Sequence, residues 1–344
     1  VNDNDNANIS SSSFETHSGF HRLESEEFPS LTSETKHAGI PADLINSDYY
    51  NNNEDYQGNP TYTKDQWRAL TQMCEDMGMY VLPGLDMPGH SLLYNKYAAE
   101  NPDNIEWLAG GTMLAPSTTS LGQQLELLDL TGPNSQRALR FASTLWDEYT
   151  RGEDPVVNAD VVHIGADEYW VHNQATNDAF AKFADTMRQT IQNNLGEDTK
   201  IRMWGASTGS FATAQTALGK TAQELAEDYQ LDIWSTAYDQ AAQRVAEGYQ
   251  VINCRDAFLY ANPGRTNRDV PNAEYLFYDW NPTMFGGNNP LVGEPNLVGA
   301  KGVVWGDQSQ EGMTEQDIHQ RVLRTVSILS EKTWGGTDEE DTFP

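Results

Sequence analysis

Two kinds of hydrophobic spacing run along this chain, and together they predict alternating helices and strands. Apolar residues that recur every three or four positions predict helices at 63–77, 135–149, 173–195, 221–229, 240–247 and 314–331. Short and nearly continuous apolar runs predict buried strands at 80–86, 161–165, 201–205, 231–235, 249–254 and 302–306. Helices in this alternating order are expected to cover the faces of a sheet.

Two of the predicted helices also indicate which face they bury. The helix at 63–77 begins with a capping box formed by Thr63 and Gln66, and Gly78 ends it. Its apolar stripe comprises Trp67, Leu70, Met73, Cys74 and Met77. The stripe of the helix at 135–149 comprises Ala138, Leu139, Ala142, Leu145, Trp146 and Tyr149. Such stripes are typical of helices that pack against a core.

The order of these elements predicts the fold class. Predicted strands that are mostly followed by helices indicate a parallel α/β fold, and we expect a (β/α)8 TIM barrel. The pattern lacks two of the strands that such a barrel needs, and only residues 1–3 resemble the end of one. We therefore expect an N-terminally truncated barrel without its first strand and most of its second. The barrel domain would cover 1–334, and the acidic residues 335–344 would form a tail or linker.

Residues 4–60 are rich in Asn, Ser, Asp and Gly and show little hydrophobic periodicity. This composition is typical of long loops. Within this stretch, 19–24 and 28–31 mix aromatic, basic and apolar residues. We therefore expect an ordered loop near a binding face rather than a disordered leader.

Charge and hydropathy exclude several classes of partner. Acidic residues outnumber basic ones by 51 to 21, and the net charge of −30 would repel nucleic-acid phosphates. Nucleic acid is therefore not an expected partner. The chain has no run of 18 apolar residues, so we expect no membrane-spanning segment. It opens on polar residues without a signal-peptide pattern, and we expect a mature or trimmed piece.

Chemically distinctive side chains follow the ends of the predicted strands. They are acids, a histidine and aromatic residues: Asp86, His90, Asp167, Glu168, Trp204, Trp234, Tyr260, Trp305 and Asp307. In α/β barrels the catalytic residues come from this end of the strands. Aromatic rings suit the apolar faces of sugars and carboxylates suit sugar hydroxyls, so the pattern predicts a carbohydrate pocket.

The adjacent acids Asp167 and Glu168 pose a chemical problem. Successive side chains of a strand point to opposite faces, so these two should not flank one glycosidic bond as a nucleophile and an acid would. Separate roles would solve this problem: one carboxylate orients a 2-acetamido group that attacks the anomeric carbon, and the other protonates the leaving oxygen. Two alternatives are a pair of solvent-facing acids and a metal site formed by Asp86, His90 and His163.

Two motifs resemble signatures of the family 20 glycoside hydrolases, the β-N-acetylhexosaminidases. Residues 163–168 are similar to the family's His-x-Gly-Gly-Asp-Glu motif, with Ala166 in place of the second glycine, and 84–90 resemble its second signature. Shorter matches follow in the same order at 62–66, 203–204, 251–253, 259–260 and 304–307. The resemblance covers most of the chain. It implies a retaining glycosidase with a catalytic TIM-barrel domain that needs no cofactor and no metal.

The resemblance also assigns roles to the residues at the strand ends. Asp167 would orient the acetamido group and stabilise the oxazolinium intermediate, and Glu168 would be the general acid and then the base for water. Tyr260 would donate a hydrogen bond to the acetamido oxygen, and His90 would contact the acid, with Asp3 behind it. The substrate-binding residues would be Asp86, Trp204, Trp234, Asn262, Trp305 and Asp307, with the three tryptophans walling the −1 sugar.

Two departures from the family pattern bear on the substrate. Asn262 stands where the family usually has an aspartate that binds the outer hydroxyls of a terminal sugar, and the family's first-strand arginine is absent from this chain. Asn262, residues 19–25 and the sequence Trp-Gly-Asp at 305–307 resemble the lacto-N-biosidases, which release Gal-β-1,3-GlcNAc from the non-reducing ends of oligosaccharides. A plain exo-β-N-acetylhexosaminidase is the alternative.

Two interpretations from other classes stay open. One is a non-catalytic glycan-binding barrel, although such a protein would need neither Asp167 nor Glu168 as an acid. The other is a metal-dependent hydrolase. For the enzyme we expect an oligosaccharide or glycoconjugate substrate. Because large glycans are met outside the cell, we also expect an extracellular or cell-surface bacterial location.

Overall fold

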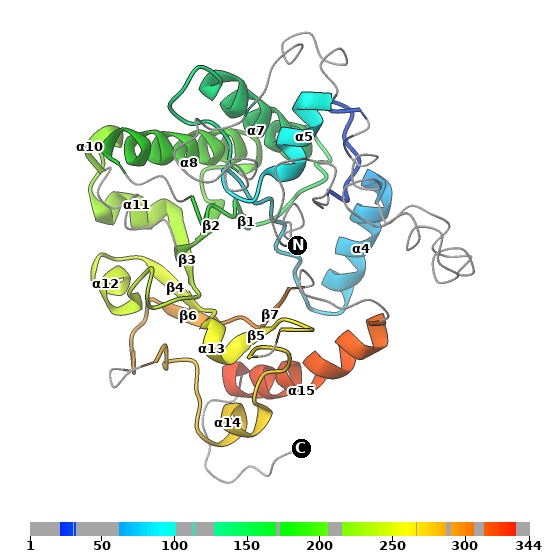
Figure 1. The fold of residues 1–344 in the computed structure, drawn as a ribbon, viewed down its shortest axis with the longest axis vertical. Coiled ribbons are helices and arrows are strands. Elements are labelled where there is room, and N and C mark those ends of the chain that lie inside the picture. The colour runs from blue at the N-terminus through cyan, green and yellow to red at the C-terminus, as the bar shows by residue number, and fades with distance from the viewer. Residues whose placement is uncertain are drawn as a thin grey trace. The chain divides into compact units, whose positions relative to one another are not determined.

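The computed structural model describes residues 21–29, 31, 62–100, 113, 127–169, 173–205, 215–265, 267–286, 290–305 and 313–334 (Figure 1). The chain divides into two compact units. Unit 1 covers Val1–Arg202 and Thr213–Gly219, and unit 2 covers Met203–Ala212 and Lys220–Pro344.

Unit 1 is built mainly from helices. These helices are α4 (Lys64–Asp76), α5 (Leu92–Glu100), α7 (Ser135–Thr150), α8 (Gln174–Leu195) and α10 (Gln215–Leu218). Its strands are β1 (Val161–His163) and most of β2 (Lys200–Trp204), which run parallel with Val162 opposite Ile201. The long helix α8 connects them and so forms a βαβ crossover. The sequence did not predict α5 or α10.

Helix α4 begins as the sequence predicts but buries less than expected. The Thr63 side chain accepts from the backbone N–H of Gln66, and the Gln66 side chain accepts from that of Thr63, so both halves of the capping box are present. Trp67 is buried, whereas Met73 and Met77 are 53% and 59% exposed. The interpretation of this stripe as a core face was therefore wrong at Met73 and Met77, whereas Leu70 and Cys74 are partly buried.

Helix α7 buries the face that its periodicity predicts. Of the six predicted stripe residues, Leu139 is partly buried and the other five are buried: Ala138, Ala142, Leu145, Trp146 and Tyr149. The helix packs against α8, whose own buried residues include Phe180, Phe183 and Met187. The two longest described helices of unit 1 thus form its main helical layer.

The segment before the second signature is less regular than a strand. Only Gly84 forms a parallel bridge, opposite His163, and Tyr80 is exposed. Three backbone hydrogen bonds nevertheless fix residues 83–87 beside β1: His163 N–H to Pro83 O, Leu85 N–H to His163 O and Met87 N–H to Ile164 O. The predicted strand at 80–86 is therefore reduced to this short extended stretch.

Residues 21–29 form an ordered segment, as predicted. Glu24 N–H donates to Tyr62 O over 2.9 Å, and Glu148 of α7 accepts from Ser25 Oγ and from the backbone of Glu26. Lys64 lies 2.8 Å from the same Glu148 carboxylate. Residues 4–20 and 32–60 lie outside the described residues, and a binding face near this segment stays a prediction.

Unit 2 continues the alternation of strands and helices. Its helices are α11 (Ala222–Asp228), α12 (Ala241–Ala246), α13 (Asp256–Leu259), α14 (Ala273–Tyr278) and α15 (Glu315–Trp334). Strands β3 (Tyr229–Ile233), β4 (Gln250–Asn253) and β6 (Leu297–Ala300) form one parallel sheet, and β5 (Tyr260–Ala261) pairs in parallel with β7 (Val303–Val304).

The predicted elements of unit 2 are confirmed to within a few residues, and several short ones were missed. β3, β4 and β7 fall at the predicted strands, and α11, α12 and α15 fall at the predicted helices. β5, β6, α13 and α14 were not predicted, because they are too short or too polar to show a clear period. Leu259, Leu276, Phe277, Trp280 and Ile328 form a core between α13, α14 and α15.

The strand ladders within each unit are parallel, in agreement with the predicted α/β class. In the described part of the chain, however, the strands do not close into an eight-stranded barrel. The predicted truncation of a barrel stays a prediction. Among the described helices, none has both the length and the apolar composition that crossing a bilayer requires.

Candidate active site

The adjacent acids lie in a tight turn that follows β1. The strand ends at His163, and Gly165, Ala166 and Glu168 have φ values of 71°, 71° and 50°. These left-handed conformations interrupt the alternation of a strand. The predicted strand at 161–165 was therefore too long, and the expectation that Asp167 and Glu168 face opposite ways was wrong.

Buried Asp86 supports this turn from the neighbouring segment. Its Oδ1 accepts a hydrogen bond of 2.9 Å from the backbone N–H of Ala166. A Cβ at Gly165 would lie 1.9 Å from that same oxygen, so no side chain fits there. Gly165 is thus required both for its backbone conformation and for its contact with Asp86.

His90 contacts both acids of the pair. Its Nε2 lies 3.2 Å from Glu168 Oε2 and 3.7 Å from Asp167 Oδ2. Gly89 brings this loop against the turn, since a Cβ there would lie 2.5 Å from the carbonyl oxygen of Asp167. The structure therefore brings Asp86, His90, Asp167 and Glu168 together in unit 1, as the sequence predicted.

The two carboxylates differ in environment. Asp167 is buried and its Oδ1 has no hydrogen-bond partner among the described residues, whereas the Glu168 side chain is 32% exposed. Burial alone would raise the pKa of Asp167. The nearby His90 and a hydrogen bond with Asp86 outweigh burial, and the pKa of Asp167 lies below its ordinary value. Asp167 is therefore suited to accept a hydrogen bond as an anion, and Glu168 to exchange protons with a ligand.

The same cluster could also hold a cation. Ligand atoms of Asp86, His90 and Asp167 all lie within 4.8 Å of one another. The sequence suggested His163 as the third ligand, but its Nδ1 lies 2.9 Å from the Gly165 N–H and accepts from it. Any metal site among the described residues would therefore use Asp167 in place of His163.

In unit 2, the four predicted aromatic residues come together. Trp204 lies in a buried cluster with Ile252 and Cys254, against which Trp234 and Trp305 pack. The Tyr260 ring is stacked with Trp234 at 6.4 Å and meets Trp305 edge-on at 6.1 Å, and the Trp204 and Trp305 rings are 6.0 Å apart. These contacts form a continuous aromatic group in which Trp204 and Tyr260 are buried, and its role as a wall for a sugar stays a prediction.

Two further predicted residues differ in their outcome. Asn262 is buried just beyond Tyr260, and its Oδ1 has no partner among the described residues. The role of Asn262 in binding substrate stays a prediction. Asp307 lies outside the described residues, and its role stays a prediction, as does that of Asp3.

Sequence reasoning missed three residues beside the aromatic group. Tyr238 is 46% exposed and its ring lies 5.1 Å from Trp234. Lys301 lies over the Trp204 ring and pairs with Asp232, which is buried in β3. The acid between Leu231 and Ile233 was the available signal, because a buried charge needs a partner.

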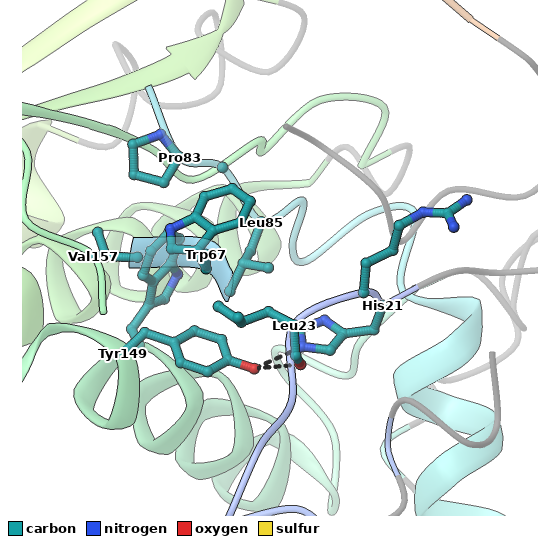
Figure 2. Close-up of a pocket in the computed structure, with 10 residues that line it drawn as sticks. His21, Leu23, Trp67, Pro83, Leu85, Tyr149 and Val157 are labelled. Carbon is teal, nitrogen blue, oxygen red and sulfur yellow. Dashed lines mark hydrogen bonds between the residues drawn. The ribbon is translucent and has the colours of Figure 1, made fainter. Parts of the chain in front are cut away.

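Unit 1 also contains a small apolar pocket that is separate from the acid pair (Figure 2). Its volume is about 50 Å³, and its lining includes Leu23, Trp67 and Leu85. Buried His21 borders it, with Nε2 2.7 Å from the Tyr149 hydroxyl, which donates to Leu23 O. The burial of His21 lowers its pKa to about 4. The described residues that line this pocket include no carboxylate, and we assign the pocket to the packing of unit 1.

We expect the chain to lose stability in mild acid because of His21. Its pKa is 6.5 when unperturbed and about 4 when folded, so the unfolded state binds the proton first as the pH falls. The free energy of unfolding should decrease between about pH 6.5 and pH 4, by roughly 2 kcal/mol at pH 5. Urea unfolding of His21→Asn at pH 7 and pH 5 should show a smaller pH difference than the wild type. The exposed-site control His319→Asn should keep the wild-type difference, and an unchanged difference in His21→Asn would contradict the assignment.

Comparison with known proteins defines the class of this chain. The profile of "Glycosyl hydrolase family 20, catalytic domain" matches residues 16–337. This match and the structural neighbours place the chain in the class of α/β domains of the TIM-barrel type. The chain belongs to glycosyl hydrolase family 20, which confirms the resemblance seen in the sequence.

Individual relatives agree with this family. A curated lacto-N-biosidase from Bifidobacterium bifidum is 24% identical over 293 residues, which are 79% of this chain and 23% of that protein. The chain thus spans less than a quarter of that relative's length. Dispersin B aligns with a TM-score of 0.62 at 18% identity, over 92% of this chain and 87% of its own. The exo-β-N-acetylglucosaminidase from Vibrio harveyi, in complex with N-acetylglucosamine, aligns with a TM-score of 0.61 at 15% identity. The alignment covers 94% of this chain and 49% of that one. These structural likenesses bear on the fold alone.

Proposed function

We propose that this chain hydrolyses β-linked N-acetylhexosaminides with retention, using the substrate's own 2-acetamido group as the nucleophile. The arrangement of His90 between Asp167 and Glu168 carries this proposal. The buried Asp167 oxygen without a partner suits the acetamido N–H, and the more exposed Glu168 suits proton exchange with the leaving oxygen and with water. The difference in burial between these two adjacent acids suits them to the two different roles.

The reaction would proceed in two steps. First, the acetamido oxygen attacks the anomeric carbon, the glycosidic bond breaks, and Glu168 gives its proton to the departing oxygen. The Asp167 anion stabilises the positive charge of the oxazolinium that forms. Second, the Glu168 carboxylate takes a proton from water, and the water oxygen attacks the same carbon and reopens the ring. Tyr260 would donate to the acetamido oxygen, and the aromatic group would bind the sugar faces.

We further propose that the released product is lacto-N-biose. The similarity to the B. bifidum lacto-N-biosidase supports this substrate, and so does Asn262, where a neutral amide replaces a charge suited to a terminal monosaccharide. Contacts with a second sugar, linked to the sugar in the −1 subsite, would then replace the contacts that a charged side chain makes with the outer hydroxyls of a terminal sugar. Because oligosaccharides of this kind are met outside cells, we propose an extracellular or cell-surface location in a bacterium.

Turnover of two chromogenic substrates tests this specificity. The purified chain should release nitrophenol faster, by at least roughly tenfold in kcat/KM, from the lacto-N-biose glycoside than from the N-acetylglucosamine glycoside, since each 1.4 kcal/mol of added binding is worth tenfold. Faster turnover of the monosaccharide would favour the exo-β-N-acetylhexosaminidase. Glycan binding without turnover of either would favour a non-catalytic barrel, and loss of turnover on chelation would favour metal chemistry at Asp86, His90 and Asp167.

A further inference from the structure

Strand β3 contains a charged residue where the neighbouring pattern is apolar. Asp232 is fully buried, and in the register of β3 with β4 it lies opposite Ile252. Ile252 belongs to the buried cluster of Trp204, and Trp234 follows Asp232 by two residues. By the alternation of a strand, Asp232 therefore lies one layer beneath the aromatic group, on the same side of β3 as Trp234.

Lys301 brings a positive charge to this layer. It directly follows β6, and its backbone N–H donates to Asn253 O over 2.9 Å, which fixes where its side chain begins. Its Nζ forms an ion pair with Asp232 Oδ2 and lies 3.9 Å from the centroid of the Trp204 ring. The ammonium thus contacts a carboxylate and an indole face at once, a geometry that gives a cation–π attraction.

Stability alone does not account for this pair. Burying the Asp232 carboxylate is costly, and because the Lys301 side chain is 33% exposed, solvent screens part of the attraction between the two charges. A charge held over an indole does something that an apolar pair cannot, because it draws one face of the ring toward a fixed point. The ring also packs within the cluster of Ile252, Cys254, Trp234 and Trp305, and the ammonium adds a directional attraction to this apolar packing.

We propose that Lys301 and Asp232 are a positioning pair that fixes the Trp204 indole in the orientation needed to wall the sugar. This inference rests on the proposed function, in which Trp204 binds the −1 sugar. Asp232 fixes the Lys301 ammonium by an ion pair, and the ammonium fixes the Trp204 indole by a cation–π contact. Neither charged residue would touch the reacting atoms. Their loss should therefore weaken productive sugar binding while leaving the acids of unit 1 able to react.

A double substitution tests the pair without leaving a buried charge alone. Lys301→Met with Asp232→Asn keeps similar side-chain volumes and should lower kcat/KM for the N-acetylhexosaminide by about tenfold, mainly through KM, with an altered near-UV circular dichroism spectrum. Lys301→Arg keeps a cation that can stack on the indole and should stay within about threefold of the wild type. The matched control is Lys220→Met with Asp228→Asn, since this pair also lies in unit 2, at 2.9 Å, and should change neither measurement.

A substitution of Trp204 distinguishes a pair that positions this ring from a pair that only stabilises unit 2. In a Trp204→Leu background, the double substitution should cause no further loss, because the ring that it positions is gone. An equal tenfold loss in that background would overturn the proposal, and so would wild-type kcat/KM and spectrum in the double variant. If Trp204→Leu does not fold, the spectrum and KM of the double variant and of Lys301→Arg still decide the proposal. If the wild type hydrolyses no N-acetylhexosaminide, the proposed function fails, and the near-UV spectrum still reports whether the pair orients the indole.

Discussion

Glu168→Gln is expected to lower kcat/KM for an oligosaccharide substrate by roughly 10²- to 10⁴-fold. The amide has nearly the shape of the acid and can keep the contact with His90, which lies 3.2 Å from the carboxylate. It cannot give a proton to the departing oxygen, and it cannot take one from water in the second step. Steady-state kinetics on lacto-N-biose-terminated oligosaccharides would measure the loss.

Substrates with different leaving groups test the role of Glu168 as the general acid more directly. A dinitrophenyl glycoside departs with little protonation, so Glu168→Gln should lose much less of the first step with that substrate than with an oligosaccharide. Glu153→Gln, at an exposed position, is the control and should keep full activity. Equal losses with both substrates would argue against Glu168 as the acid, provided that the circular dichroism and thermal midpoint of the variant match the wild type.

Asp167→Asn is expected to reduce kcat by roughly 10²- to 10³-fold while glycan affinity is largely kept. The lowered pKa of Asp167 keeps this carboxylate ionised, so its negative charge is available when the oxazolinium develops. The asparagine amide keeps a similar size but loses that charge, and its effect should therefore be larger in the transition state than in the bound substrate.

Binding calorimetry with N-acetylglucosamine alongside kinetics would check the Asp167 prediction. Asp160→Asn is the matched control, because Asp160 is exposed and directly precedes β1, at the opposite end of the strand from Asp167. Lost affinity together with retained turnover would refute the acetamido role. It would place Asp167 among residues that only bind the sugar.

The helical periodicity of the sequence predicted the burial of side chains correctly in some helices and not in others. The stripe of α7 is buried as predicted, because a helix repeats its faces every few residues whatever lies beyond it. The stripe of α4 has the same period, yet Met73 and Met77 are exposed. Periodicity marks the face that is able to pack, whereas burial depends on which elements are present to cover it.

In the candidate site, too, the sequence predicted which residues take part but not how the backbone arranges them. The motif at 163–168 and the strand-end residues pointed to the acids and aromatic groups, and the family comparison agrees with that motif. The shape of the turn could not be predicted, since Ala166 and Glu168 adopt left-handed conformations that side chains disfavour. A hydrogen bond from Ala166 N–H to Asp86, 80 positions away, supports that turn.

The sequence by itself determined the parallel α/β class, the identity of most strand-end residues and the family of glycoside hydrolases, because each of these rests on residue type and short spacing. Tertiary structure alone decided that His90 meets Asp167 as well as Glu168, that Asp167 rather than His163 joins Asp86, and that Lys301 pairs with Asp232 from 69 positions away. Such contacts depend on backbone turns and on strand register, and these are set by the packing of distant segments rather than by the order of neighbouring residues.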